Sequence, residues 1–196
     1  GGSLNDTVGA MISGTQSMMP SVLRILTSGV LAGALVKTGS AARIAQWVVD
    51  ALGSRFAAAA VAVATMIVTA VGVFVDIAVI TVAPVALAVG KRAGVPVGAL
   101  LVAMVGGGKA GNIISPNPNT IAAADAFKVD LTSLMAANII PAIAALVATV
   151  IIAGVISRKE SVRNIRSMDA GETSENLPPI ASALVGPTVV IALLSL

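Results

Sequence analysis

Long apolar segments constrain this chain more than any other feature of its sequence. Several runs of about 17–22 residues carry at most one charge, which is the length that a helix needs to cross ~30 Å of hydrocarbon. Hydrophobic residues make up 57% of the chain and charged residues only 11%, whereas charged residues are about a quarter of a soluble domain. We therefore expect an integral, all-α membrane protein that crosses a cell (inner) membrane several times.

The residue types that the chain lacks exclude several kinds of chemistry. It has no cysteine and no histidine, which removes disulfides, thiol nucleophiles and typical zinc sites. The net charge of +3 comes from Lys and Arg in loops, and in a membrane protein such charges indicate orientation rather than binding of nucleic acid. We expect no cofactor, no bound metal and no nucleic-acid partner.

The apolar blocks divide the chain into a repeat, a linker and part of a further span. Because the chain begins Gly-Gly-Ser without an initiator Met and ends inside an apolar run, we expect a fragment of a longer protein. The expected parts are a first transmembrane repeat at 1–156, with spans at about 18–36 and 135–156, a re-entrant helical hairpin at 56–90 and a broken span at 99–124, then a cytoplasmic linker at 157–179 and the truncated start of a further span at 180–196.

The apolar block at 56–90 decides the expected topology. As one straight helix, its 35 residues would measure about 52 Å, which is too long for a bilayer unless the helix is strongly tilted. A single helix would also place its two basic flanks on opposite sides, although Lys and Arg favour cytoplasmic loops. We therefore favour a split near Gly72–Asp76 and a re-entrant hairpin. Two short full spans stay open, because the charge bias does not distinguish them.

The stretch GGGKAGNIISPNPNT, residues 106–120, places helix breakers and polar groups inside an apolar span. Its four glycines weaken a helix, and Pro116 and Pro118 remove two backbone donors. Irregular backbone at membrane depth must be covered by protein or line a wet cavity, and secondary transporters build substrate sites from such discontinuous helices. Glycine and proline can also serve only as packing and kinking devices. We expect unwound backbone over 106–119, with a substrate site beside it.

The groups in this break suit an anionic, hydroxylated ligand. Lys109, about 15 Å into the span, offers positive charge, although it could instead snorkel or form a structural pair. A half-helix that starts near Asn119–Thr120 would offer free N–H groups at its N-terminus, with Asn or Thr as its cap. The candidate substrate-binding residues are Lys109, Asn112, Ser115, Asn117, Asn119 and Thr120.

Asp76 is the candidate residue for proton coupling. It is the only acid inside an apolar segment, and apolar surroundings favour the protonated form of a carboxyl group, which suits a proton carrier. Two structural alternatives are an ion pair with Lys109 and a cap on the second arm of the hairpin. Na⁺ is the alternative coupling ion.

Three segments carry a family resemblance: SGVLAGALVKTGSAARIA at 28–45, FVDIAVITVAPVALAVGKRAG at 74–94 and MVGGGKAGNIISPNPNTIAAADAF at 104–127. Together they resemble the first half of the gluconate:proton symporter (GntP) family of the ion-transporter superfamily, over about residues 5–156. The resemblance implies two inverted repeats, each with a re-entrant hairpin and a discontinuous helix. It also implies a substrate site between the hairpin tip near Asp76 and the SPNPNT break, and a homodimer in the lipid bilayer.

The resemblance further implies a proton-coupled permease for small anionic hydroxy-acids. Gluconate-type members typically have a His-Pro pair where this chain has Asn117-Pro118, so the implied substrates extend to sugar acids, glycerate-like acids and a polar amino acid. A channel for small polar solutes is the alternative, because SPNPNT loosely resembles Asn-Pro half-helices of water and glycerol channels. We do not expect an enzyme: GGGKAG lacks the spacing of a phosphate loop, and the one arrangement left is a Ser115–Lys109 dyad.

Overall fold

The described chain is helical throughout. A computed structural model describes residues 3–159 and 177–194, and within them it contains helices and no strand. This confirms the predicted all-α class for those residues. The elements are α1 (Leu4–Lys37), α2 (Ser40–Leu52), a 3₁₀ turn η1 (Ser54–Phe56), α3 (Ala57–Ala70), α4 (Val75–Ala93), α5 (Val97–Asn112), α6 (Pro118–Phe127), α7 (Leu131–Ala137), α8 (Ile139–Lys159) and α9 (Ile180–Leu194).

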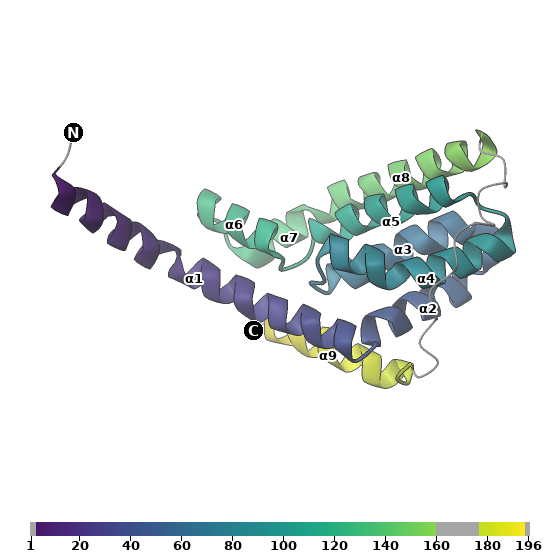
Figure 1. The fold of residues 1–196 in the computed structure, drawn as a ribbon, viewed down its shortest axis with the longest axis horizontal. Coiled ribbons are helices and arrows are strands. Elements are labelled where there is room, and N and C mark those ends of the chain that lie inside the picture. The colour runs from purple at the N-terminus through teal and green to yellow at the C-terminus, as the bar shows by residue number, and fades with distance from the viewer. Residues whose placement is uncertain (1–2, 160–176, 195–196) are drawn as a thin grey trace.

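The first helix is longer than the predicted span at 18–36. It starts at Leu4 because Ser3 and Asp6 form a capping box, in which each side chain accepts a hydrogen bond from the backbone N–H of the other residue. Its 34 residues measure about 51 Å, well beyond the thickness of a hydrocarbon core. Figure 1 shows the N-terminal half of α1 projecting beyond the other helices, while α1 also contacts α2, α6 and α9.

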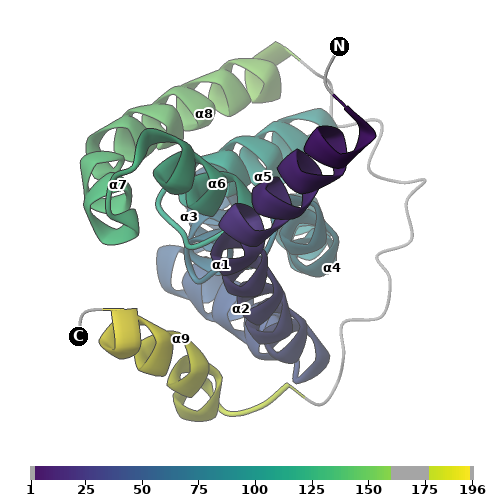
Figure 2. The ribbon, with the colours of Figure 1, turned by 90° about the vertical axis from the view of Figure 1, so that its left-hand side faces the viewer.

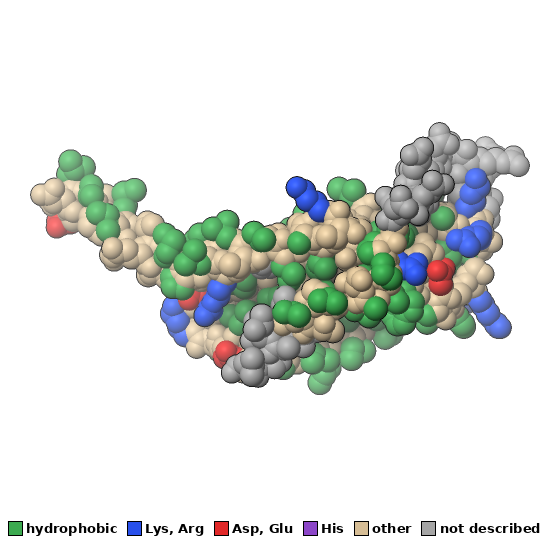
Figure 3. Space-filling model, turned by 90° about the horizontal axis from the view of Figure 1, so that it is seen from below, with side chains coloured by type: hydrophobic (Ala, Val, Ile, Leu, Met, Phe, Trp, Pro, Cys, Tyr) green, Lys and Arg blue, Asp and Glu red, His purple; other side chains and the backbone are tan. Residues whose placement is uncertain are grey.

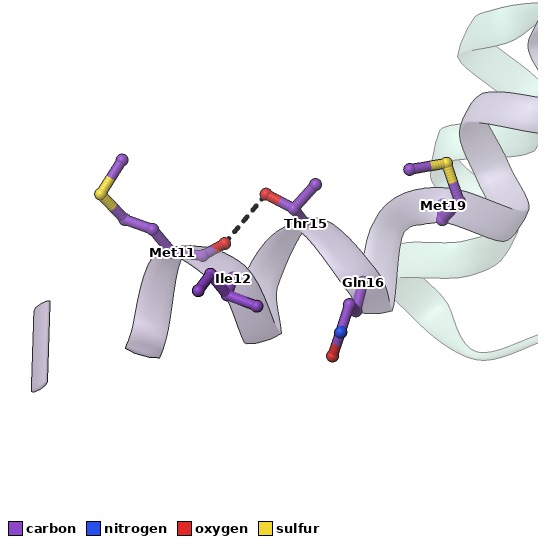
Figure 4. A pocket seen from close by; sticks show the side chains of 5 residues that line it. All are labelled: Met11, Ile12, Thr15, Gln16 and Met19. Carbon is purple, nitrogen blue, oxygen red and sulfur yellow. Dashed lines mark hydrogen bonds between the residues drawn. The ribbon is translucent and has the colours of Figure 1, made fainter. Parts of the chain in front are cut away.

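A hollow of about 390 Å³ follows the projecting part of α1 (Figure 4). Its lining residues all belong to this one helix and are exposed, so the hollow is an open furrow between side chains rather than an enclosed site. We assign no ligand to it. The lining residues are Met11, Ile12, Thr15, Gln16 and Met19.

The apolar block at 56–90 is divided at the predicted place. α3 ends at Ala70 and α4 starts at Val75, and Gly72 between them has φ +108°, which glycine adopts without the steric cost that other residues meet. The two arms pack against each other and measure about 21 and about 28 Å. Because the second arm is almost long enough to cross a bilayer, the choice between a re-entrant hairpin and two short spans stays a prediction.

The amphipathic helix α2 lies across the bundle. It buries a stripe that includes Ile44, Ala45 and Val48 against α3, α4 and α9, and the chain then bends by 102° into η1 and α3 at Gly53. Within the described residues, α1 and α8 are long and apolar enough to cross a membrane, and the bent pair adds a third crossing if it counts as one broken span.

The central helix is α5, which lies against α3, α4 and α8 (Figures 1 and 2). Its glycines allow the closest approach to α3. A Cβ at Gly107 would overlap the backbone carbonyl oxygen of Ala62, and a Cβ at Gly111 would overlap the carbonyl oxygen of Met66. Membrane helices use such small residues to bring backbones together, so this side of α5 is a helix-packing surface.

This arrangement corrects the prediction that residues 106–119 are unwound. α5 stays helical through Asn112, and the irregular backbone is confined to residues 113–117. The remaining glycines also serve packing, because a Cβ at Gly106 would overlap Thr149 of α8 and one at Gly108 would press on Val75 of α4. The glycines therefore do not break the helix, because the contacts they permit hold it in place.

Basic residues lie at one end of the bundle. Lys91 and Arg92 end α4, Arg158 and Lys159 end α8, and both helix ends lie at the right of Figure 1. η1, which contains Arg55, also contacts α4. The charge bias predicts that these helix ends share the cytoplasmic side, and that orientation stays a prediction. From below, hydrophobic side chains cover much of the surface, and several Lys and Arg side chains stand on the right-hand part of the view (Figure 3).

The last expected span, 135–156, corresponds to α8, which is preceded by the short helix α7. Asp130 caps α7: hydrogen bonds from the Thr132 hydroxyl and from the Ser133 backbone N–H hold the pKa of Asp130 below its usual range. Most of the predicted linker, residues 160–176, lies outside the described residues. The expected further span contains α9, which packs against α2 and α1.

Candidate substrate site

The break between α5 and α6 is built by local chemistry. α5 ends at Asn112, and α6 starts at Pro118 with Asn117 as its N-cap. Proline suits the first position of a helix because its missing N–H would have no partner there in any case, and asparagine is among the best N-cap residues. Asn117 and Pro118 therefore start α6. The break consists of residues 113–117, which lie between the two helices.

Three buried side chains tie the break to the end of α5. The backbone carbonyl oxygen of Asn112 accepts hydrogen bonds from the Ser115 hydroxyl at 3.1 Å, from the Thr120 hydroxyl at 3.2 Å and from the Asn117 side-chain amide. The exposed fractions of Ser115 and Asn117 are both 0%. These buried side chains pair with one another and with the end of α5, which lets irregular backbone lie inside an apolar fold.

The first turn of α6 is closed by its own cap. The Asn117 Oδ1 accepts from the backbone N–H of Asn119 at 2.8 Å and of Thr120 at 3.3 Å, and the Asn117 carbonyl accepts from Ile121 N–H at 3.0 Å. Pro118 has no N–H. The prediction that this half-helix offers free N–H groups is therefore wrong, because the neighbouring side chain reaches them first. The half-helix starts at Pro118, slightly before the predicted start near Asn119–Thr120, and its cap is an asparagine, Asn117.

The side chain of Asn112 differs from these hydrogen-bonded side chains, because its oxygen has no partner among the described residues. It is 4% exposed, and its Oδ1 is fully buried without a hydrogen-bond partner. Among the described side chains, only Arg43 Nε shares this condition. An unpaired acceptor of this kind costs free energy, so the group that bonds to this oxygen is still to be accounted for.

Three predicted residues lie at the surface: Lys109, Asn119 and Asp76. Lys109 continues an exposed stripe of α5 that contains Leu101 and Val105. Within the described residues the only ion pair joins Lys128 to Asp125, so the alternative of a Lys109–Asp76 pair is wrong. The Ser115–Lys109 dyad is not formed either, since Ser115 is buried and bonded elsewhere.

Asp76 is exposed, so the expected burial of its carboxyl group is not found in this part of the protein. It occupies the first turn of α4, where the N-cap residue Phe74 provides no side-chain hydrogen bond. A negative charge near a helix N-terminus is favoured by the helix dipole. This location is close to the predicted structural alternative, a cap on the second arm, and a coupling role stays a prediction.

The two breaks lie together. Gly108 on α5 faces Val75, the first residue of α4. Gly111, about one helical turn further along α5, faces Met66 and Thr69 near the end of α3. The start of α4 therefore lies beside the end of α5, and the predicted hairpin tip and the predicted break form one region.

Asn138 supports this region and was missed by sequence reasoning. Its Nδ2 donates a hydrogen bond of 3.1 Å to the Ile113 carbonyl, which anchors the break to the junction of α7 and α8. The two residues are 25 positions apart in the chain. No sequence spacing predicts such a contact, because only the packing of α8 along α5 brings them together.

Comparisons with known proteins agree with this architecture. The chain matches the GntP family permease over residues 1–196. It is 51% identical over 193 residues to an "Uncharacterized transporter" of Haemophilus influenzae, an alignment that covers 98% of this chain and 46% of the relative. No solved structure matches the chain. The chain belongs to the GntP permease family, and it spans about half the length of the curated relative that it matches.

Proposed function

We propose that the protein is a secondary active transporter that imports gluconate or a related small hydroxy-carboxylate across the inner membrane, by proton symport. Family membership and the printed name of the Haemophilus influenzae relative support transport as the activity. Because the chain spans about half of that relative, the proposal concerns the intact protein. We also propose that it acts as a homodimer in the bilayer, which light scattering in detergent would test.

The observation that carries the proposal is the internally satisfied break between α5 and α6. Ser115, Asn117 and Thr120 use their polar groups to hold the break together. Breaks of this kind, beside an apolar helical hairpin, are how secondary transporters make a polar site within lipid. Of the predicted ligands, Asn112 keeps a buried side-chain oxygen without a partner within the described structure, and Lys109 and Asn119 are exposed.

These groups suggest separate roles. Lys109 attracts the carboxylate, and the amides of Asn112 and Asn119 bind hydroxyl and carboxylate groups. Ser115, Asn117 and Thr120 mainly fix the position of the break. Asp76 carries the coupled proton from the first turn of α4, which lies beside the end of α5.

Uptake into proteoliposomes tests the proposal. The intact protein would be reconstituted and supplied with labelled gluconate or glycerate under an inward proton gradient, with or without a protonophore. We expect saturable uptake that the protonophore abolishes, together with counterflow in its presence. Non-saturable flux without counterflow would indicate the channel alternative. Uptake that follows a sodium gradient instead would replace the proton as the coupling ion, and no flux of either acid would refute the substrate class.

A further inference from the structure

The amide of Asn112 stands out among the asparagines of this region because its oxygen has no described partner. The amide of Asn117 caps α6 with its oxygen and donates to Ser115 and Thr120 with its nitrogen. The amide of Asn138 donates to Ile113. The amide of Asn112 is as deeply placed, with 4% exposure, yet its buried oxygen has no partner among the described residues. Native structures pair nearly all such groups, so this amide calls for a ligand.

The position of Asn112 places this amide where three helix ends meet. It is the last residue of α5, next to Gly111, which lies against the last turn of α3. One turn earlier on α5, Gly108 lies against the first residue of α4. The charged end of Lys109 is exposed on the same turn of α5. A ligand that reaches the Asn112 amide therefore has a cation at hand for its own negative charge.

The chemistry of a primary amide narrows the ligand. An amide presents one acceptor and one donor side by side. A 2-hydroxy-carboxylate presents a hydroxyl donor and a carboxylate acceptor on adjacent carbons, which is the complementary pair. A 2-deoxy acid keeps the carboxylate but has no donor for the buried oxygen.

We propose that Asn112 is a specificity-determining residue: its Oδ1 accepts a hydrogen bond from the 2-hydroxyl group of the substrate, and its Nδ2 donates to the substrate carboxylate. This inference rests on the proposed function, because it names the chemical feature by which the same site selects its substrate. The permease therefore selects 2-hydroxy acids over acids whose hydroxyl groups lie only farther along the chain.

Binding of two matched probes tests the inference. Gluconate and 2-deoxygluconate carry the same charge and differ only at the 2-hydroxyl. Titration calorimetry on the purified intact protein should give about ten- to a hundredfold weaker binding of 2-deoxygluconate, since the buried acceptor is then left unpaired. In Asn112→Leu, which removes the amide but keeps the branching of the side chain, both probes should bind with affinities that agree within about threefold. Asn112→Asp, the isosteric second variant, keeps acceptors but loses the Nδ2 donor and should bind both probes more weakly than wild type.

Thermal unfolding without ligand gives a readout that a structural role would not produce. Asn112→Leu should unfold at a higher temperature than wild type, because an unpaired buried polar group is replaced by an apolar one. The control Asn138→Leu should unfold at a lower temperature, because it breaks the hydrogen bond to Ile113, and should keep the wild-type ratio of the two affinities. A lower unfolding temperature for Asn112→Leu would overturn the inference.

The failures of the two proposals can be told apart. Equal binding of gluconate and 2-deoxygluconate by wild type, or an unchanged affinity ratio in Asn112→Leu, overturns the role of Asn112 but leaves the proposed substrate class intact. Binding of neither probe refutes the substrate class and this inference with it. If titration with sodium chloride alone released heat in wild type but not in Asn112→Leu, the Asn112 Oδ1 would be a cation ligand. That result would overturn the inference.

Discussion

The contact between Gly107 and Ala62 makes the packing of this fold testable. Changing Gly107 to Ala places a methyl group on the backbone carbonyl oxygen of Ala62. No side-chain rotation relieves the overlap, because the obstacle is main chain on α3. The two helices must separate by about 1 Å or more before the methyl group reaches ordinary van der Waals distance, and a gap of that size forfeits a quarter to a half of each dispersion contact.

The magnitude follows from two opposing terms. Overpacking in a close-packed interior costs about 1–3 kcal/mol, whereas replacing a helical glycine by alanine gains up to about 1 kcal/mol of helix propensity. Gly154 on α8 provides the matched control, since it is helical and a Cβ there would meet nothing within 4 Å. The gain in propensity is the same in both variants, so the difference between them, about 1–3 kcal/mol, measures the overlap alone.

The assay is unfolding of the intact protein in detergent, by heat or by denaturant, for wild type, Gly107→Ala and Gly154→Ala. We expect Gly107→Ala to be less stable than wild type and Gly154→Ala to be equal or more stable. Equal stability of the two variants would refute the reasoning, because it would mean that α3 and α5 do not approach as closely as the structure shows.

Three further predictions concern the candidate site. Lys109→Ala should keep wild-type stability within about 0.5 kcal/mol, because the side chain is exposed, but should bind gluconate about tenfold more weakly; unchanged affinity in calorimetry would contradict a ligand role. Asp76→Asn should show uptake that no longer depends on the pH gradient while counterflow persists, and a retained pH dependence would remove this residue as proton carrier. Asn117→Ala should lower the free energy of unfolding by about 1–2 kcal/mol, because the cap of α6 is lost. The control Asn119→Ala, which changes an exposed side chain, should unfold like wild type. Similar losses of stability in both variants would argue against the observed cap.

The elements that sequence reasoning located are those with strong local signals. The division between α3 and α4 follows from length and from Gly72, and α6 starts at Pro118, close to the predicted start near Asn119–Thr120. The glycines at 106–111 led to the wrong prediction that this part of α5 is unwound. Glycine weakens an isolated helix, but here its missing side chain admits α3, and the resulting contacts outweigh the lower propensity.

The sequence also did not predict which face of each helix is buried. In α5, apolar and small residues occur on every side, so the spacing carries little information about which side is buried. The sequence therefore predicted six polar ligands without separating Asn117, which is buried and bonded, from Asn119, which is exposed.

The sequence alone determined that this chain is an apolar, helical protein whose helices are interrupted near Gly72 and near the SPNPNT motif. Those properties depend on the length of the apolar segments and on proline and polar residues, all of which act along the chain. Only the tertiary structure decided which polar groups satisfy one another and which stay free. The Asn112 Oδ1 is buried without a described partner at the end of α5, where the neighbouring Gly111 packs against α3, and such packing joins segments that are distant in sequence.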